Sequence, residues 1–147
     1  MPLTDRPPDA DLRPPALVDL RGAMALEGVD LLLLLVEDRE LSACGVEDIA
    51  VVLASRGTAV VRQPIPDMGI PTDVDVFRAT LARVAARIAV GDTIAIACRA
   101  GLGRSGMAAA CLLVGAGLDP DVAIERVRAA RPGAIETPDQ EAFVRRW

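Results

Sequence analysis

One short stretch of the sequence, residues 93–106, combines residue types that could perform nucleophilic chemistry on an anionic substrate. It reads Thr-Ile-Ala-Ile-Ala-Cys-Arg-Ala-Gly-Leu-Gly-Arg-Ser-Gly, so an apolar, β-branched run ends at Cys98 and Arg104 follows six residues later. A helix-forming run begins at Met107. The pattern predicts a buried strand, a glycine-containing loop and the N-terminus of a helix, in that order.

Such a loop is suited to bind phosphate or a similar anion, because it directs backbone N–H groups and the positive end of the helix dipole into one concavity. Cys98 would lie at its floor, where these groups favour the nucleophilic thiolate. Arg104 would hold two oxygens of the anion in bidentate fashion. The alternative is that Cys98 is an inert core cysteine before a tight turn. The other predicted phosphate-binding residues are Arg99, Ala100, Gly101, Leu102 and Gly103.

The overall composition limits the possible classes of protein. A length of 147 residues indicates one domain, and a net charge of −5 argues against sequence-independent binding of nucleic acid. The three cysteines include no C-x-x-C pair, which favours the reducing cytoplasm over a disulfide framework. The longest aliphatic run, 31–36, is too short to span a bilayer, so we predict a soluble protein without a membrane partner.

The absence of histidine restricts the chemistry further. Ser-His-Asp and Cys-His catalysis are excluded, as is any zinc site that contains histidine. All 16 basic residues are arginine, so the lysine of a Walker A loop is also missing. A reactive cysteine in this chain must therefore be activated by backbone N–H groups, a helix dipole and arginine. We predict neither a metal nor a cofactor.

Strands and helices alternate in the predicted secondary structure. Residues 1–15 contain five prolines and are expected to form a flexible arm before a single catalytic domain at 16–147. The apolar run 31–36 fits a central strand buried on both faces. We therefore predict an α/β three-layer sandwich with a central, mostly parallel sheet of four or five strands. The other expected elements are strands at 17–20, at 58–62 and before Cys98, a helical turn at 22–27, and helices at 46–55, 72–90, 104–116, 119–131 and 137–147.

The sequence Cys98-Arg-Ala-Gly-Leu-Gly-Arg-Ser105 resembles the Cys-x5-Arg-Ser/Thr loop of the cysteine-dependent protein phosphatases. It looks most like the dual-specificity branch, and within it the kinase-associated phosphatases and their bacterial relatives. The resemblance is also strong at 64–71 and 131–143. It implies a protein tyrosine or dual-specificity phosphatase that forms a cysteinyl-phosphate intermediate and acts on a phosphorylated protein or another phosphomonoester.

The resemblance also implies roles for three further residues. Asp67, in the proline-flanked loop 63–71, resembles the mobile general acid that protonates the leaving oxygen. Ser105 could donate a hydrogen bond to the Cys98 sulfur when the intermediate breaks down. Gln140 matches the glutamine that helps to place the hydrolytic water. Without the family pattern they would be a turn aspartate, a residue of a helix first turn and a solvated helix glutamine, respectively.

A bidentate arginine usually needs a carboxylate behind it, and three carboxylates follow the run 31–36. Glu37, Asp38 and Glu40 are equally open as the partner of Arg104, and plain solvent exposure is the alternative for each. Cys44 and Cys111 are interpreted as small core residues.

The sequence departs from the family at one position, because Ala97 stands where the family normally has histidine before the cysteine. We expect a less readily ionised thiol and slower turnover. Ala97 also supports an alternative, a catalytically dead module that binds phosphorylated partners. A rhodanese-like or arsenate-reducing enzyme is another, and it would not require Asp67 or Gln140. Residues 101–106 match G-x-G-x-x-G as well, but a dinucleotide fold would need further strands that the remaining chain does not supply. Since the chain has no tyrosine, we expect a shallow substrate site.

Overall fold

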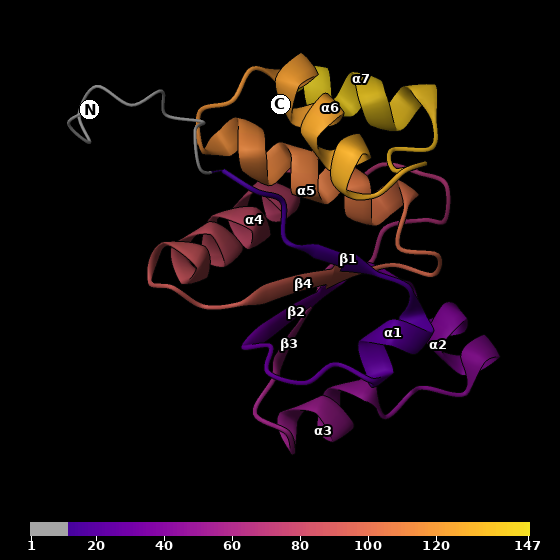
Figure 1. Ribbon diagram of the computed structural model, residues 1–147. Helices are drawn as coiled ribbons and strands as arrows, with labels where there is room; N and C mark the ends of the chain where they lie inside the picture. The colour runs from indigo at the N-terminus through magenta and orange to yellow at the C-terminus, as the bar shows by residue number, and fades with distance from the viewer. Residues whose placement is uncertain (1–11) are drawn as a thin grey trace.

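A parallel β-sheet covered by helices on both faces organises residues 12–147, the part of the chain that the computed structural model describes (Figure 1). The strands are β1 (Ala16–Val18), β2 (Leu31–Leu34), β3 (Ala59–Arg62) and β4 (Ile94–Ala97), in the order β1-β4-β2-β3. All three strand pairs are parallel. The predicted three-layer α/β class is therefore confirmed. The helices are α1 (Leu20–Met24), α2 (Asp38–Cys44) and α3 (Ile49–Ala54) on one face, and α4 (Val74–Ala89), α5 (Gly103–Gly115), α6 (Pro120–Ala130) and α7 (Pro138–Arg146) on the other.

The two central strands, β2 and β4, are apolar throughout because helices cover both of their faces. Every residue of 31–34 and 94–97 is buried, whereas the edge strands β1 and β3 are partly exposed. β2 is shorter than the predicted strand at 31–36. Leu35 and Val36 are still fully buried, and the Leu35 N–H donates to the Ala97 carbonyl at 2.9 Å.

Parallel pairing brings the carboxyl ends of all four strands to one edge of the sheet, where open α/β sheets bind ligands. At this edge β4 leads directly into Cys98, β2 leads into α2, and β3 leads into the loop that contains Asp67. The short strand β1 ends beside them at Val18, which is paired with Ala97. Segments that lie far apart in the sequence therefore meet around the cysteine.

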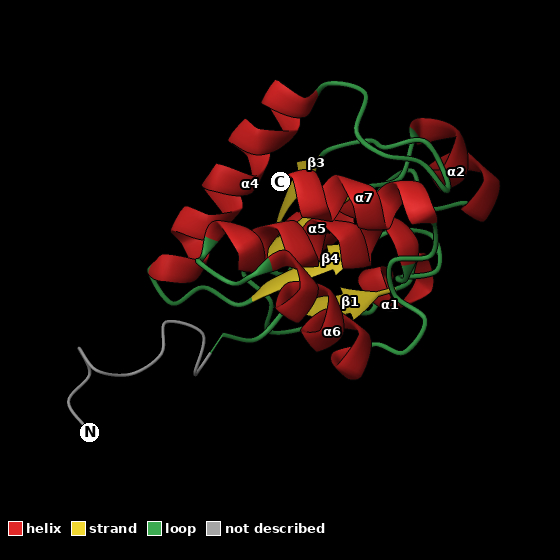
Figure 2. Ribbon diagram, turned by 90° about the horizontal axis from the view of Figure 1, so that it is seen from above, coloured by secondary structure: helices red, strands yellow, loops and turns green. Residues whose placement is uncertain are grey.

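Helix α5 lies at the centre of the upper layer, flanked by α4, α6 and α7 (Figure 2). All of its residues from Gly103 to Leu113 are buried, including a run of small ones at 108–110. A cluster of aromatic rings joins α4 to α7 in the same layer, with ring centroids 5.8 Å apart for Phe77 and Phe143 and 5.5 Å apart for Phe77 and Trp147. These contacts hold α5, and the loop before it, in a fixed position.

Two predictions about local structure were wrong. Helix α2 was not predicted, because residues 37–40 were interpreted only as carboxylates at the end of a strand. At the N-terminus of this helix the Glu37 N–H donates to the Glu40 carboxylate at 2.8 Å. Glu37 stands where Ser, Thr, Asp or Asn is the usual N-cap. Helix α1 begins two residues before the predicted turn, with Asp19 as its N-cap. Residues 1–11 of the predicted arm lie outside the described residues. Within 12–147, no helix is long and apolar enough to cross a membrane.

Candidate active site

A cavity of about 280 Å³ opens at the carboxyl edge of the sheet, directly above Cys98. Cys98 is only 3% exposed and is one of the residues that line the cavity. The predicted residues Cys98, Arg99, Ala100, Arg104, Asp67 and Gln140 all line this cavity, together with Met68 and Glu136. Four other predicted residues, Gly101, Leu102, Gly103 and Ser105, do not line it.

Hydrogen bonds from outside the cavity hold the carbonyl groups of the cysteine loop. The Arg99 carbonyl accepts from the Leu20 N–H at 3.1 Å, and the Ala100 and Gly101 carbonyls accept from the Arg131 guanidinium at 3.1 and 3.3 Å. In a trans peptide the N–H points opposite to the C=O. The N–H groups that follow these carbonyls therefore point away from Leu20 and Arg131 and are not used by these hydrogen bonds.

Two glycines allow the loop to pack this closely. Gly101 has a φ of +73°, and a Cβ built on it would lie 2.5 Å from the carbonyl carbon of Val18. Gly106, in the first turn of α5, would bring a Cβ within 2.9 Å of the Ile135 nitrogen. A side chain at either position would push the loop away from β1 or from the segment before α7.

Arg104 forms a buried ion pair with Glu40, which selects one of the three candidate carboxylates. The two nitrogens Nη1 and Nη2 donate to the two Glu40 oxygens at 2.8 and 2.7 Å, and Nη1 also donates to the Ile65 carbonyl at 2.9 Å. The side chains are 2% and 6% exposed. The other two carboxylates serve elsewhere: Glu37 pairs with Arg39, and Asp38 pairs with Arg62.

The pair also sets the ionisation of both groups. Burial alone would raise the pKa of the Glu40 carboxyl. The hydrogen bonds from Arg104 and from the Glu37 N–H outweigh this effect, together with the positive charges of Arg104 and Arg99, and hold the pKa of Glu40 below its ordinary value. Burial would likewise lower the pKa of Arg104, but the hydrogen bond and charge of Glu40, with the charges of Cys98 and Asp67, raise it. Both side chains are therefore charged at neutral pH.

The loop that carries Asp67 lies over the cavity. A turn closes between the Gly69 N–H and the Pro66 carbonyl at 2.8 Å, with Met68 at a φ of +61°. Positive φ is uncommon in a non-glycine residue and is a form of backbone strain found at functional turns. The Asp67 carboxylate lies 3.2 Å from the Arg104 Nη2, and its side chain remains 51% exposed. This position allows it to face both the cavity and solvent.

Gln140 is fully buried, so the alternative that it is a solvated helix glutamine was wrong, and its role in placing water stays a prediction. Its amide oxygen accepts from the Glu136 and Thr137 N–H groups at 3.0 and 3.2 Å, and its amide nitrogen donates to the Gly69 carbonyl at 3.1 Å. The side chain therefore ties the Asp67 loop to the start of α7. The spacing Thr137-x-x-Gln140 is a capping box, a signal of this role that was available in the sequence.

The remaining predicted residues have mixed outcomes. The Ser105 hydroxyl is buried and has no hydrogen-bond partner among residues 12–147, and its bond to the Cys98 sulfur during breakdown of the intermediate stays a prediction. Cys111 is a core residue as predicted, and burial raises its pKa. Cys44 is exposed, contrary to prediction, because it ends α2 just before the left-handed Gly45. Within residues 12–147, no cluster of three His, Cys, Asp or Glu side chains could hold a metal ion.

Comparison with known proteins gives consistent matches. The family model described as Swiss Army Knife protein, DSP-PTPase phosphatase domain, matches residues 17–144. The structure of Tk-PTP in the active form is similar at 32% identity and a TM-score of 0.74, over 91% of this chain and 86% of that chain. Kinase associated phosphatase (KAP), with its catalytic-site cysteine substituted by serine, is similar at 28% identity and a TM-score of 0.75, over 80% of this chain and 67% of that chain.

A more distant structure, PTPMT1, shares the fold at 20% identity and a TM-score of 0.72, over 90% of this chain and 86% of that chain. It has also been crystallised in complex with PI(5)P.

The first prediction concerns the acid stability of the Arg104–Glu40 pair. Because the pKa of Glu40 is lower in the folded state, its contribution to stability is complete above the ordinary value of 4.5 and is lost as the pH falls below it. We expect Glu40→Gln to lower the free energy of unfolding at pH 7 by about 3 kcal/mol, since it leaves the buried Arg104 with only the half-exposed Asp67 as a counter-charge. Urea unfolding from pH 7 to 3 should show that the variant loses less stability with acid than the wild type. Glu47→Gln, at an exposed position, is the control; parallel acid profiles for wild type and Glu40→Gln would contradict the prediction.

The second prediction concerns Arg131 as a positioning residue of the loop. Arg131→Gln removes the charged donors that hold the Ala100 and Gly101 carbonyls, so the loop N–H groups should lose their common direction. We expect the affinity for inorganic phosphate, measured by isothermal titration calorimetry, to fall about tenfold, or about 1.4 kcal/mol. Arg145→Gln, which removes an exposed guanidinium that pairs with Asp121 and Glu141, should bind phosphate like the wild type. Equal affinities in all three proteins would remove Arg131 from the site.

Proposed function

The chain belongs to the DSP-PTPase phosphatase family, and on that premise we propose that it hydrolyses phosphomonoesters, with Cys98 as the nucleophile and phosphorylated protein side chains as the expected substrates. The observation that carries the proposal is the arrangement of Cys98, Arg104 and Asp67 around one cavity. A nucleophile, a phosphate-binding guanidinium and a carboxyl group near the leaving oxygen are the three groups that this chemistry needs.

In the first step the Cys98 thiolate attacks phosphorus. The sulfur–phosphorus bond forms as the ester phosphorus–oxygen bond breaks, and protonated Asp67 transfers its proton to the departing oxygen. The loop N–H groups and the Arg104 side chain stabilise the charge on the non-bridging oxygens. Since Glu40 and the Ile65 carbonyl already fix the guanidinium, it needs little reorganisation when phosphate binds.

In the second step a water molecule attacks the phosphorus of the intermediate. The sulfur–phosphorus bond breaks and a proton of the water passes to the Asp67 carboxylate. This step regenerates the Cys98 thiolate and releases inorganic phosphate. Ser105, whose hydroxyl has no partner, is the proposed donor to the departing sulfur. Gln140 is assigned a positioning role, because its amide groups are bonded to Gly69 and to the start of α7.

The proximity of Asp67 to Arg104 favours this reaction over the two alternatives. A rhodanese-like or arsenate-reducing enzyme would not require a carboxyl group at that position, and a binding module needs no proton donor. Ala97, the basis for the binding module, is a fully buried residue of β4 that packs inside the sheet. Among residues 12–147, no aromatic side chain lines the cavity, which supports a shallow site that accepts more than one type of phosphorylated residue.

Turnover of para-nitrophenyl phosphate tests the proposed nucleophile. The wild type should release nitrophenolate between pH 5 and 8, and Cys98→Ser should be inactive because a neutral hydroxyl replaces the thiolate. The matched control is Cys44→Ser, which changes an exposed cysteine and should retain full activity. A wild type that binds phosphate but releases no nitrophenolate would favour the binding module.

The proposed general acid is tested with leaving groups of different basicity. Asp67→Asn cannot supply a proton, so hydrolysis of phenyl phosphate, whose leaving oxygen needs protonation, should slow by about 10² or more in kcat/KM. Hydrolysis of an aryl phosphate with a strongly acidic phenol should slow much less. Asp73→Asn, at the exposed N-cap of α4, serves as the control. Equal slowing for both substrates would mean that Asp67 acts in binding and not in proton transfer.

A further inference from the structure

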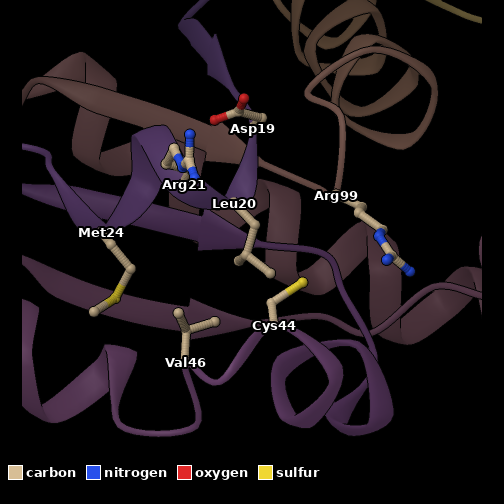
Figure 3. Close-up of a pocket in the computed structure, with 7 residues that line it drawn as sticks. All are labelled: Asp19, Leu20, Arg21, Met24, Cys44, Val46 and Arg99. Atoms are coloured by element: carbon tan, nitrogen blue, oxygen red, sulfur yellow. The ribbon is translucent and has the colours of Figure 1, made fainter.

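A second and larger cavity, of about 470 Å³, lies beside the catalytic one (Figure 3). We call it the flanking pocket. Arg99, the residue that follows the nucleophile, lines both cavities. The mechanism proposed for Cys98, Arg104 and Asp67 makes no use of this second cavity.

The interior of the flanking pocket is apolar and is built from three segments. Leu20 and Met24 come from α1, Cys44 from the end of α2, and Val46 from the connection to α3. Figure 3 shows these four side chains arranged around the same hollow. Leu20 is only 3% exposed, and Met24 and Val46 pack against the hydrophobic core. Because the core anchors these residues, the pocket exists before any ligand binds, as is usual for ligand sites.

The rim of the pocket is polar and carries two positive charges, Arg21 and Arg99. The third charged residue, Asp19, caps α1 with its carboxylate, which accepts from the Gly22 N–H at 2.6 Å, so the lining keeps a net positive charge. An apolar interior with arginines at its mouth matches a ligand that has an aliphatic group and nearby negative charge.

We propose that the flanking pocket is a specificity subsite that binds an aliphatic side chain one or two residues away from the phosphorylated residue of a peptide substrate. This inference rests on the proposed phosphatase activity. An extended peptide advances about 3.3 to 3.6 Å per residue, so a neighbouring side chain can pass Arg99 while the phosphate lies over Cys98. An acidic residue on the same peptide would pair with Arg21.

A peptide fits these features better than a lipid in a membrane. The net charge of −5 disfavours approach to an anionic bilayer, which attracts basic surfaces. The pocket is also bounded by charged groups at its mouth, whereas membrane-inserting surfaces present exposed apolar residues.

The test measures kcat/KM for two phosphopeptides that differ only in leucine or alanine next to the phosphorylated residue, with para-nitrophenyl phosphate as the substrate that cannot reach the pocket. We expect the wild type to prefer the leucine peptide by about tenfold, the lower end of what one apolar contact gives. Cys44→Trp, which fills the pocket from an exposed position, should abolish that preference and leave para-nitrophenyl phosphate hydrolysis unchanged. Cys44→Ala is the matched control and should keep the preference.

The outcomes separate this inference from the function on which it rests. No turnover of para-nitrophenyl phosphate would overturn the proposed function itself. Turnover with equal kcat/KM for both peptides, or a preference that survives Cys44→Trp, would overturn only the subsite. If circular dichroism shows Cys44→Trp to be unfolded, Met24→Trp fills the pocket from α1 and is judged by the same ratio. A soluble short-chain phosphoinositide that is hydrolysed better than both peptides, and is selectively impaired by Cys44→Trp, would overturn the assignment to a peptide.

Discussion

The buried pair of Arg104 and Glu40 is the interaction on which the rest of the site depends. A guanidinium with 2% of its side chain exposed is stable only when its charge and its N–H groups are satisfied. Glu40 satisfies them from α2, the Ile65 carbonyl from the connection after β3, and Arg104 itself belongs to the first turn of α5. Through this ion pair and the hydrogen bond to Ile65, Arg104 therefore joins three separate connections that follow β2, β3 and β4. These connections surround Cys98.

The cysteine loop keeps its shape without histidine, and the hydrogen bonds to its carbonyls explain how. Where the family normally has histidine, Ala97 contributes only packing within the sheet. The loop is held instead from its outer side, by the Leu20 N–H of α1 and by the Arg131 guanidinium beyond α6. Because these donors fix the carbonyls, the order of the loop does not require a polar side chain beneath the nucleophile.

The sequence was sufficient to predict the parts of the site that are local in the chain. The strand, loop and helix around Cys98 follow from one continuous stretch, and the predicted alternation of elements led to the correct fold class. Glu40 could not be distinguished from Glu37 because the choice depends on α2, a helix whose N-cap is an uncommon glutamate. Cys44 was misplaced for a similar reason: residue type favours burial, but its position at the end of α2 decides its exposure.

In the proposed function and subsite, recognition and chemistry are carried by different kinds of structure. The catalytic cavity is lined by the cysteine loop together with Arg104, Asp67 and Gln140, groups that act on the phosphate and its leaving oxygen whatever the rest of the substrate is. The flanking pocket is lined mostly by residues of α1 and by Cys44 and Val46 at and after the end of α2, none of which is a member of the Arg104–Glu40 pair. Arg99 belongs to both cavities. A change in substrate preference could therefore arise on the surface of α1 and α2 while the reaction at Cys98 stays intact.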